Sequence, residues 1–311
     1  MARYIGKRLL ISVITLLVIL LVLFLLLQLM PGSPFNDQKL SPEQIAVLKE
    51  KYGLDKPVIF QFFQYISNMV RGDLGVSYSL SADTPITELL VNRFPLTIKI
   101  GFFSMVIGTV AGLLLGFLTA FFKNKVLNII YNVLTLLGIA IPSYLFAMCF
   151  SYFLGYKGKL FPLLYDFRSP VVSSVMPVVA MSLGVMAVIA RFSKAEAEDV
   201  IKSDYVLLAR CQGLPNHTII TRYVLKNSLM PVITVMAGLL VGLLTGSLVI
   251  EKMFSVPGVG GLLTNAISAN DYSVIIALSF IYSALYIVVI LIMDILYCII
   301  DPRVRLGGVS E

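Results

Sequence analysis

The chain has 311 residues, of which 58% are hydrophobic and only 13% are charged. Soluble domains average about 25% charged residues, so this chain has too few charges to cover a water-soluble globule. The net charge of +7 does not indicate a nucleic-acid partner, because the basic residues flank apolar stretches and form no stripe or arm. The composition therefore favours a membrane protein.

Stretches without ionisable residues locate the membrane spans. Each is longer than the roughly 20 apolar residues that a helix needs to cross a bilayer. The first is not a cleaved signal peptide, because its apolar run is too long and Met30-Pro31-Gly32 is a poor cleavage site. We therefore expect an all-α integral membrane protein with six transmembrane helices, at 9–30, 100–122, 127–154, 171–190, 231–250 and 273–298.

Lysine and arginine set the orientation. With the N-terminus inside, the cytoplasmic segments hold most of them, and the short outer loops hold only Lys157, Lys159, Arg168 and Lys252. The basic loop at 155–170 pulls the other way but is outnumbered. Both termini are thus predicted to be cytoplasmic. The expected parts are an N-terminus with the first helix (1–30), an outer loop (31–98) and a permease core (99–311) with a cytoplasmic loop (191–230).

The outer loop carries signals of folded structure. Ser41, Pro42 and Gln44 have the spacing of a capping box with proline at the first helical position. Gly53 is a suitable helix stop, and a second apolar-aromatic segment follows at 57–70. We expect a small cap of amphipathic helices; the alternative is a disordered loop.

The loop at 191–230 is the most informative stretch. Ser203 and Asp204 can cap a short helix that ends near Gln212, and Gly213 can take the left-handed conformation that stops it. A second helix then runs from Leu214-Pro215-Asn216 to Met230. Such a helix–turn–helix suits docking into a groove on a soluble partner.

Two spans carry glycine at every fourth residue, which lets another helix approach closely. The second span has Gly108, Gly112 and Gly116, for which generic packing is an equal alternative. The fifth span has Gly238, Gly242 and Gly246, and here we expect a moving interface because the cytoplasmic loop leads directly into it.

Several catalytic and cofactor sites are not predicted. The chain has no GxxxxGK[ST] phosphate loop, and its single histidine, His217, rules out a multi-histidine metal site. The cysteines, Cys149, Cys211 and Cys298, have no paired spacing. Asp294 is the ionisable residue deepest in a span, and a packing or pairing role is favoured over an ion-coupling site. The chain is expected to be no enzyme and to bind no cofactor or metal.

The sequence resembles the permease subunits of binding-protein-dependent ABC importers for oligopeptides, dipeptides and nickel. The likeness covers nearly the whole chain and is closest to the first of the two permeases of such importers. It rests on Tyr4-Ile5-Gly6-Lys7-Arg8-Leu9-Leu10, Met30-Pro31-Gly32, Tyr52-Gly53-Leu54-Asp55-Lys56-Pro57, Gly72-Asp73-Leu74-Gly75, Arg93-Phe94-Pro95-Leu96-Thr97, Pro257-Gly258-Val259-Gly260 and Asp301-Pro302-Arg303.

The resemblance implies the type I ABC importer permease fold in the bacterial plasma membrane. It also implies a second homologous permease, two cytoplasmic ABC ATPases that use ATP and Mg²⁺, and an extracellular substrate-binding lipoprotein. Segment 203–231 is similar to the family's ATPase-contacting EAA loop, although Leu207-Leu208 replaces the leading Glu-Ala and Pro231 lies farther from Gly213. The expected coupling residues are Asp204, Tyr205, Ala209, Arg210, Gly213, Leu214 and Pro215.

Three functions compete for this sequence: an ATP-driven importer, an ion-coupled secondary transporter and a membrane scaffold. A secondary transporter should show inverted repeats and intramembrane charges, and neither is clear. A scaffold does not need the docking loop with the glycine strips. Oligopeptides rank above dipeptides, nickel chelates or other small solutes as cargo. The candidates for lining the translocation path are Asn132, Ser143, Tyr144, Ser182, Thr245 and Ser247.

Overall fold

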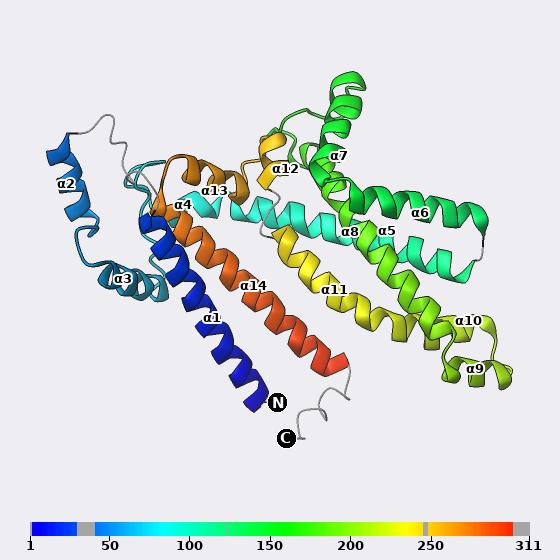
Figure 1. Cartoon of the computed structure of the whole chain (residues 1–311). Coiled ribbons are helices and arrows are strands. Elements are labelled where there is room, and N and C mark those ends of the chain that lie inside the picture. The colour runs from blue at the N-terminus through cyan, green and yellow to red at the C-terminus, as the bar shows by residue number, and fades with distance from the viewer. Residues whose placement is uncertain (1, 30–40, 123, 245–247, 301–311) are drawn as a thin grey trace. The chain divides into compact units, whose positions relative to one another are not determined.

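The computed structural model describes residues 2–29, 41–122, 124–244 and 248–300, which are mostly helical and contain no β-strand. Figure 1 shows the arrangement of the helices. In chain order they are α1 (Ala2–Leu29), α2 (Pro42–Lys51), α3 (Val58–Val70), α4 (Ile86–Val91), α5 (Phe94–Phe121), α6 (Lys125–Ala140), α7 (Ser143–Phe150), the π-helix η1 (Ser151–Lys157), α8 (Pro170–Ile201), α9 (Asp204–Cys211), α10 (Asn216–Thr218), the π-helix η2 (Ile219–Leu225), α11 (Lys226–Leu244), α12 (Leu248–Met253), α13 (Val259–Ser268) and α14 (Tyr272–Ile300).

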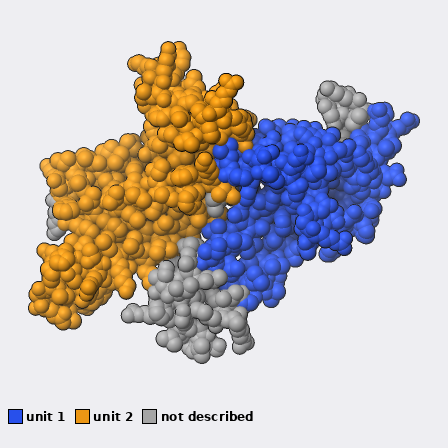
Figure 2. Space-filling model, turned by 180° about the vertical axis from the view of Figure 1, so that it is seen from behind, with its two compact units in different colours: residues 1–96, 258–311 blue, residues 97–257 orange. Residues whose placement is uncertain are grey.

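Contacts divide the chain into two compact units, which Figure 2 shows in different colours. Unit 1 combines residues 1–96 with 258–311, and unit 2 comprises residues 97–257. The first and last spans therefore belong to the same unit although they lie at opposite ends of the sequence. The division into an N-terminal helix, an outer loop and a permease core stays a prediction.

The predicted membrane-spanning architecture is confirmed. In the described ranges, five apolar helical stretches are long enough to cross a membrane: Arg8–Leu29, Ile86–Phe121, Pro170–Ile201, Asn216–Leu243 and Tyr272–Ile292. A sixth span results when α6 is counted together with the helix formed by α7 and η1, which meet at an angle of 105°.

That bend corrects the prediction of one unbroken helix at 127–154. Pro142 offers no N–H for the helical ladder, and the residue before a proline is pushed towards extended conformations. Ile141 accordingly has φ −93° and ψ 121°, so α6 ends at Ala140 and α7 begins at Ser143. Charge-free length alone cannot register such a break.

Two helices continue past the charged residues that bound their predicted membrane spans. α8 extends to Ile201, so the beginning of the predicted 191–230 loop is helical. Arg191 and Asp199 in this part are exposed and Lys194, Glu196 and Glu198 are half-buried, while Ser193 and Ala197 are buried. The fifth span forms one continuous stretch from Asn216 to Leu243. The short helix α12 then follows the undescribed residues 245–247.

In unit 1, α1 packs along α14 and contacts α3. The rings of Phe24 and Phe62 meet edge to face with centroids 5.8 Å apart. The predicted capping box of α2 is confirmed, because Gln44 N donates to Ser41 Oγ over 3.3 Å and Ser41 N donates to Gln44 Oε1 over 2.9 Å. Gly53, with φ +67°, ends this helix as expected.

A buried carboxylate fastens residues 77–80 of unit 1 to the start of α14. Asp271 is fully buried and accepts hydrogen bonds from the Ser77 hydroxyl and from the backbone N–H groups of Tyr78, Ser79 and Leu80. Because buried polar groups are costly unless they are paired, this cluster fixes a long-range contact that the sequence does not signal.

In unit 2, α8 is the central element and contacts α6, α7, α11 and α12. It also receives α5, since the Ser104 hydroxyl of α5 donates to Val178 O of α8 over 3.2 Å. The helices α9 and α10 lie at one end of α8, and α7 and α12 lie at the other (Figure 1). This arrangement places the predicted docking segment at one extremity of the unit.

Candidate functional site

The predicted docking segment is a helical hairpin (residues 203–225). It consists of α9, a turn at residues 212–215, α10 and η2. Its position at the end of α8 leaves its outer face away from the other helices of unit 2 (Figure 1). The structure thus has the helix–turn–helix shape that the sequence predicted.

Gly213 makes the turn. Its φ is +74°, a region that residues with a Cβ rarely enter. Gly213 N donates to Arg210 O over 3.0 Å, and Leu214 N donates to Ala209 O over 3.2 Å. This pair of bonds is the Schellman pattern that satisfies the last carbonyls of a helix. The predicted left-handed conformation of Gly213 is confirmed.

The start of α9 differs from the prediction. Ser203 occupies the N-cap position in an extended conformation, but its side chain accepts no hydrogen bond from α9. Its hydroxyl instead donates to Val200 O over 2.6 Å, so it serves the end of α8. Asp204 lies in the first turn and Arg210 in the last turn of α9, where their charges complement the helix dipole.

The inner face of the hairpin is a small apolar core. Val206 and Ala209 of α9 pack with Ile219 and Val224 of η2 and with Ala197 of α8. Partly buried side chains complete it, including Leu214 of the turn and Phe117 and Phe121 at the end of α5. The hairpin is therefore a packed element and not a loose connector.

The outer face of the hairpin carries apolar side chains that point away from this core. Leu207 and Leu208 are 60% and 58% exposed, and Tyr205 is 41% exposed. Arg210 and Pro215 are also exposed. Apolar side chains gathered on an exposed tip are typical of a protein–protein contact. Of the expected coupling residues, Ala209 alone is buried, so it supports the hairpin from inside.

The glycine strip of α5 presses directly against α8. A Cβ added to Gly108 would lie 2.7 Å from Ser182 O, and one added to Gly112 would lie 2.7 Å from Met186 O. At Gly116 it would collide with Ser193 Oγ and lie 2.6 Å from Ala190 O. Only glycine permits this approach, so the strip is a packing surface within the chain.

The glycine strip of α11 has different surroundings. Gly238 and Gly242 are exposed, and a Cβ added to either would meet no atom of the described residues within 4 Å. Gly246 lies outside the described residues. The expectation of a moving interface at this strip stays a prediction.

The residues proposed to line the path do not form one group. Asn132 lines a cavity of about 320 Å³ on α6, while Ser143 and Tyr144 begin α7 beyond the bend. Ser182 is buried and its hydroxyl donates to Val179 O over 2.8 Å, as a packing residue would. Thr245 and Ser247 lie outside the described residues, as does the side chain of Asp294.

Two family models account for almost the entire chain. Residues 112–306 match the binding-protein-dependent transport system inner membrane component, and residues 1–101 match the N-terminal part of such membrane components. The chain belongs to this family. It is a multi-pass membrane permease of a binding-protein-dependent ABC importer, a transport subunit and not an enzyme.

Relatives and a solved structure agree with this assignment. The dipeptide transport system permease protein DppB of Lactococcus lactis is 39% identical, with 98% of this chain and 100% of that protein covered. The oligopeptide transport system permease protein OppB of Escherichia coli is 32% identical, with the same coverage. The crystal structure of an amino acid ABC transporter with histidines matches with a TM-score of 0.53 at 15% identity, over 70% of this chain and 94% of that one. That likeness shows the fold alone.

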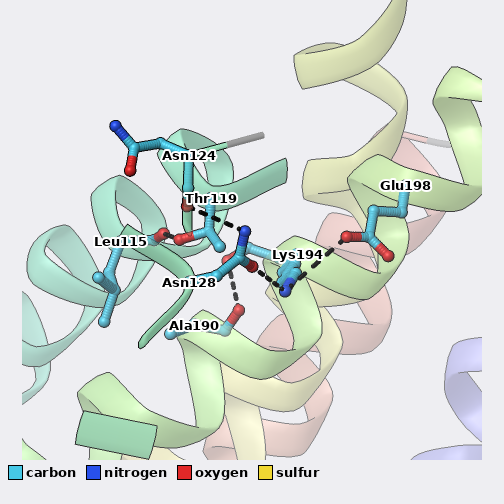
Figure 3. Close-up of polar contacts among 8 residues, drawn as sticks. Leu115, Thr119, Asn124, Asn128, Ala190, Lys194 and Glu198 are labelled. Carbon is cyan, nitrogen blue, oxygen red and sulfur yellow. Dashed lines mark hydrogen bonds and ion pairs between the residues drawn. The ribbon is translucent and has the colours of Figure 1, made fainter. Parts of the chain in front are cut away.

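Sequence reasoning missed two polar features of the permease. Glu251 is 3% exposed and accepts a hydrogen bond from the Thr97 hydroxyl over 2.7 Å. Lys194, between α6 and α8, donates to Asn128 Oδ1 over 3.1 Å and lies 3.9 Å from Glu198 (Figure 3). The helical spacing of Lys194 and Glu198 is visible in the sequence, whereas the contacts with Thr97 and Asn128 depend on tertiary packing.

Proposed function

We propose that this permease forms, with a second homologous permease, a path by which peptides enter the cytoplasm. An extracellular lipoprotein would deliver the peptide, and two cytoplasmic ABC ATPases would bind ATP and Mg²⁺, which this chain does not bind. The observation that carries the substrate class is the full-length likeness to permeases named for dipeptide and oligopeptide transport.

The helical hairpin is the proposed ATPase contact. Its core fixes the relative positions of α9 and η2, so the exposed Tyr205, Leu207 and Leu208 form a surface of defined shape. Burying these apolar side chains against a partner removes apolar surface from water, which favours association. Asp204 and Arg210 flank this surface and would select the orientation of the partner.

Movement of the hairpin would reach the membrane through two connections. η2 ends at Leu225 and α11 begins at the next residue, Lys226. The stretch from Asn216 to Leu243 is therefore one apolar helical segment. The hairpin core also includes Phe117 and Phe121 of α5. A displacement of α9 by a closing ATPase dimer would therefore shift α11 and the end of α5 together. Alternating access follows if two such arrangements differ in free energy by a few kcal/mol.

Uptake by a strain that lacks the endogenous importer tests the substrate class. The strain receives the complete operon with this permease. The substrates offered are peptides of two to about six residues, which include dipeptides and longer oligopeptides, and a nickel chelate. We expect uptake of peptides and not of the chelate. The relatives include both dipeptide and oligopeptide permeases, so the length profile decides between these classes. Chelate uptake without peptide uptake would reject the proposal.

Co-purification tests the docking surface. Leu208→Asp places a charge on the exposed face of α9 and should detach the ATPase while the two permeases remain associated. Leu160→Asp is the matched control, because Leu160 is 66% exposed in the segment after η1. Loss of the ATPase in both variants, or in neither, would contradict the assignment.

A further inference from the structure

A groove runs between α6 and α8 on one side of their contact. One cavity of about 650 Å³ is lined by Tyr131, Ile139, Val188, Arg191, Phe192, Lys194, Ala195 and Glu198. A second cavity of about 320 Å³ is lined by Asn132, Thr135, Leu136, Ile139, Ala140 and Arg191. They share Ile139 and Arg191, so the two cavities form one groove with Arg191 at its middle.

The lining of the groove combines polar and charged side chains with exposed apolar ones. Leu136, Ile139 and Phe192 are 67%, 45% and 42% exposed. The helices touch closely beside it, because a Cβ added to Gly138 would lie 2.6 Å from the Ala187 Cβ. An exposed aliphatic and aromatic lining on membrane-crossing helices suits a hydrocarbon chain better than the polar backbone of a peptide.

The two cations of the groove differ in their surroundings. Lys194 is engaged by Asn128 and Glu198 (Figure 3) and lies over the Tyr131 ring, with Nζ 4.2 Å from the centroid. Arg191 is exposed, and within the described ranges its side chain forms no hydrogen bond or ion pair. Two cations against the single carboxylate of Glu198 leave the lining positively charged, with the guanidinium of Arg191 available.

The depth of Arg191 matches a lipid headgroup. α6 and α8 run antiparallel, with Asn128 beside Lys194 and Gly138 beside Ala187, so Arg191 lies at the level of Tyr131 and Asn132. That level is about 9 Å along α6 from its first residue, Lys125, at 1.5 Å per residue. The headgroup region of one leaflet is roughly 5–8 Å thick. For an α6 perpendicular to the bilayer with Lys125 at the water surface, this places Arg191 at the boundary between headgroups and acyl chains.

We infer that the α6–α8 groove binds an anionic phospholipid. The phosphate accepts hydrogen bonds from the planar guanidinium of Arg191, which suits phosphate oxygens. Lys194 adds positive charge, and one acyl chain lies along Leu136, Ile139 and Phe192. Basic pockets between membrane helices are a recognised form of anionic-lipid recognition. The site adjoins the hairpin through α8, but it does not depend on the identity of the cargo.

Lipid retention tests this inference. The assembled transporter is purified in mild detergent from membranes supplemented with phosphatidylglycerol, and bound lipid is measured by mass spectrometry. Arg191→Gln should lower the retained phosphatidylglycerol about tenfold, whereas Lys202→Gln, which removes an exposed cation from the end of the same helix, should not. The melting temperature of delipidated transporter should rise with phosphatidylglycerol but not with phosphatidylcholine or inorganic phosphate.

Two further variants keep the test independent of folding. Glu198→Gln removes the negative charge beside Lys194 and should increase phosphatidylglycerol retention, a gain that misfolding cannot produce. Ala195→Trp fills the groove without changing its charge and should expel the lipid. Unchanged retention in Arg191→Gln overturns the inference. An equal response to inorganic phosphate would assign the site to a free anion, and displacement of lipid by a transported peptide would assign the groove to the translocation path; either result rejects a lipid site.

Discussion

The glycine strips of α5 and α11 have the same spacing but different surroundings. In α5, a Cβ at Gly108, Gly112 or Gly116 would be forced to within 2.8 Å of α8 atoms. In α11, a Cβ at Gly238 would meet no atom of the described chain within 4 Å. Glycine at every fourth residue indicates that another helix can approach closely. The glycine spacing does not indicate which helix packs there, or whether that helix belongs to the same chain.

The largest difference between the strips should appear with a bulky side chain. Gly112→Leu places a side chain where Met186 O and Ile189 already lie, and overpacking costs about 1–3 kcal/mol or more. We expect loss of a monodisperse full-length chain in detergent. Gly238→Leu, expressed in the same way without the partner permease, should remain monodisperse. Size-exclusion chromatography with thermal unfolding measures both, and equal damage in the two variants would show that the comparison is wrong.

A second test examines close helix approach at a glycine that lies outside the two strips. Gly138 of α6 is not part of such a strip, yet its Cβ would lie 2.6 Å from the Ala187 Cβ and 2.9 Å from Leu183 O. Gly138→Ala should therefore destabilise the chain by about 1–3 kcal/mol. Gly184→Ala on the facing helix is the matched control, since its nearest contact is 3.8 Å away. If Gly138→Ala and the control had the same melting temperature, close approach of α6 and α8 would not explain the glycine at this position.

Gly213 provides a third kind of glycine, needed for its backbone conformation. A Cβ there meets nothing within 4 Å, but φ is +74°, which costs an ordinary residue roughly 1–2 kcal/mol. Gly213→Val should distort the hairpin and abolish peptide uptake while membrane insertion persists. Gly213→Asn is the control, because asparagine tolerates this region, and it should retain most uptake. Full peptide uptake by Gly213→Val would show that the hairpin turn has no role in coupling to the ATPase.

Sequence reasoning succeeds where the structural signal is local. The Ser41 capping box, the stop at Gly53 and the turn at Gly213 depend on a few adjacent residues, and all three are confirmed. The spans follow from apolar length and are confirmed as elements. The ends of the helices are predicted less accurately from charge. The charged part of α8 remains helical because one of its faces is buried, and Pro142 ends α6 within a stretch that contains no charged residue.

The remaining features depend on distant parts of the chain. Asp271 binds residues 77–80 across nearly two hundred positions, and neither segment shows a motif for this contact. The groove at Arg191 requires the register of α6 against α8. The hairpin was predictable as an element, but the distinction between the buried Ala209 and the exposed Leu207 and Leu208 needs the packing of η2. Local signals therefore locate the site, and tertiary contacts decide which of its residues face a partner.

The smallest predicted effect tests what lies against α11. Replacing glycine with alanine in a helix interior stabilises it by up to about 1 kcal/mol, and Gly238→Ala has no atom of the described chain to strike. The full-length chain expressed without its partner should therefore melt at a slightly higher temperature. In the assembled transporter, a close helix of the second permease would turn the same methyl group into an overpacked contact, so the melting temperature should fall. Thermal unfolding of both preparations, with Gly184→Ala as the internal standard, measures this reversal of sign. A rise in both preparations would mean that lipid, and not a partner helix, faces Gly238, and that the two strips differ in function as well as in surroundings.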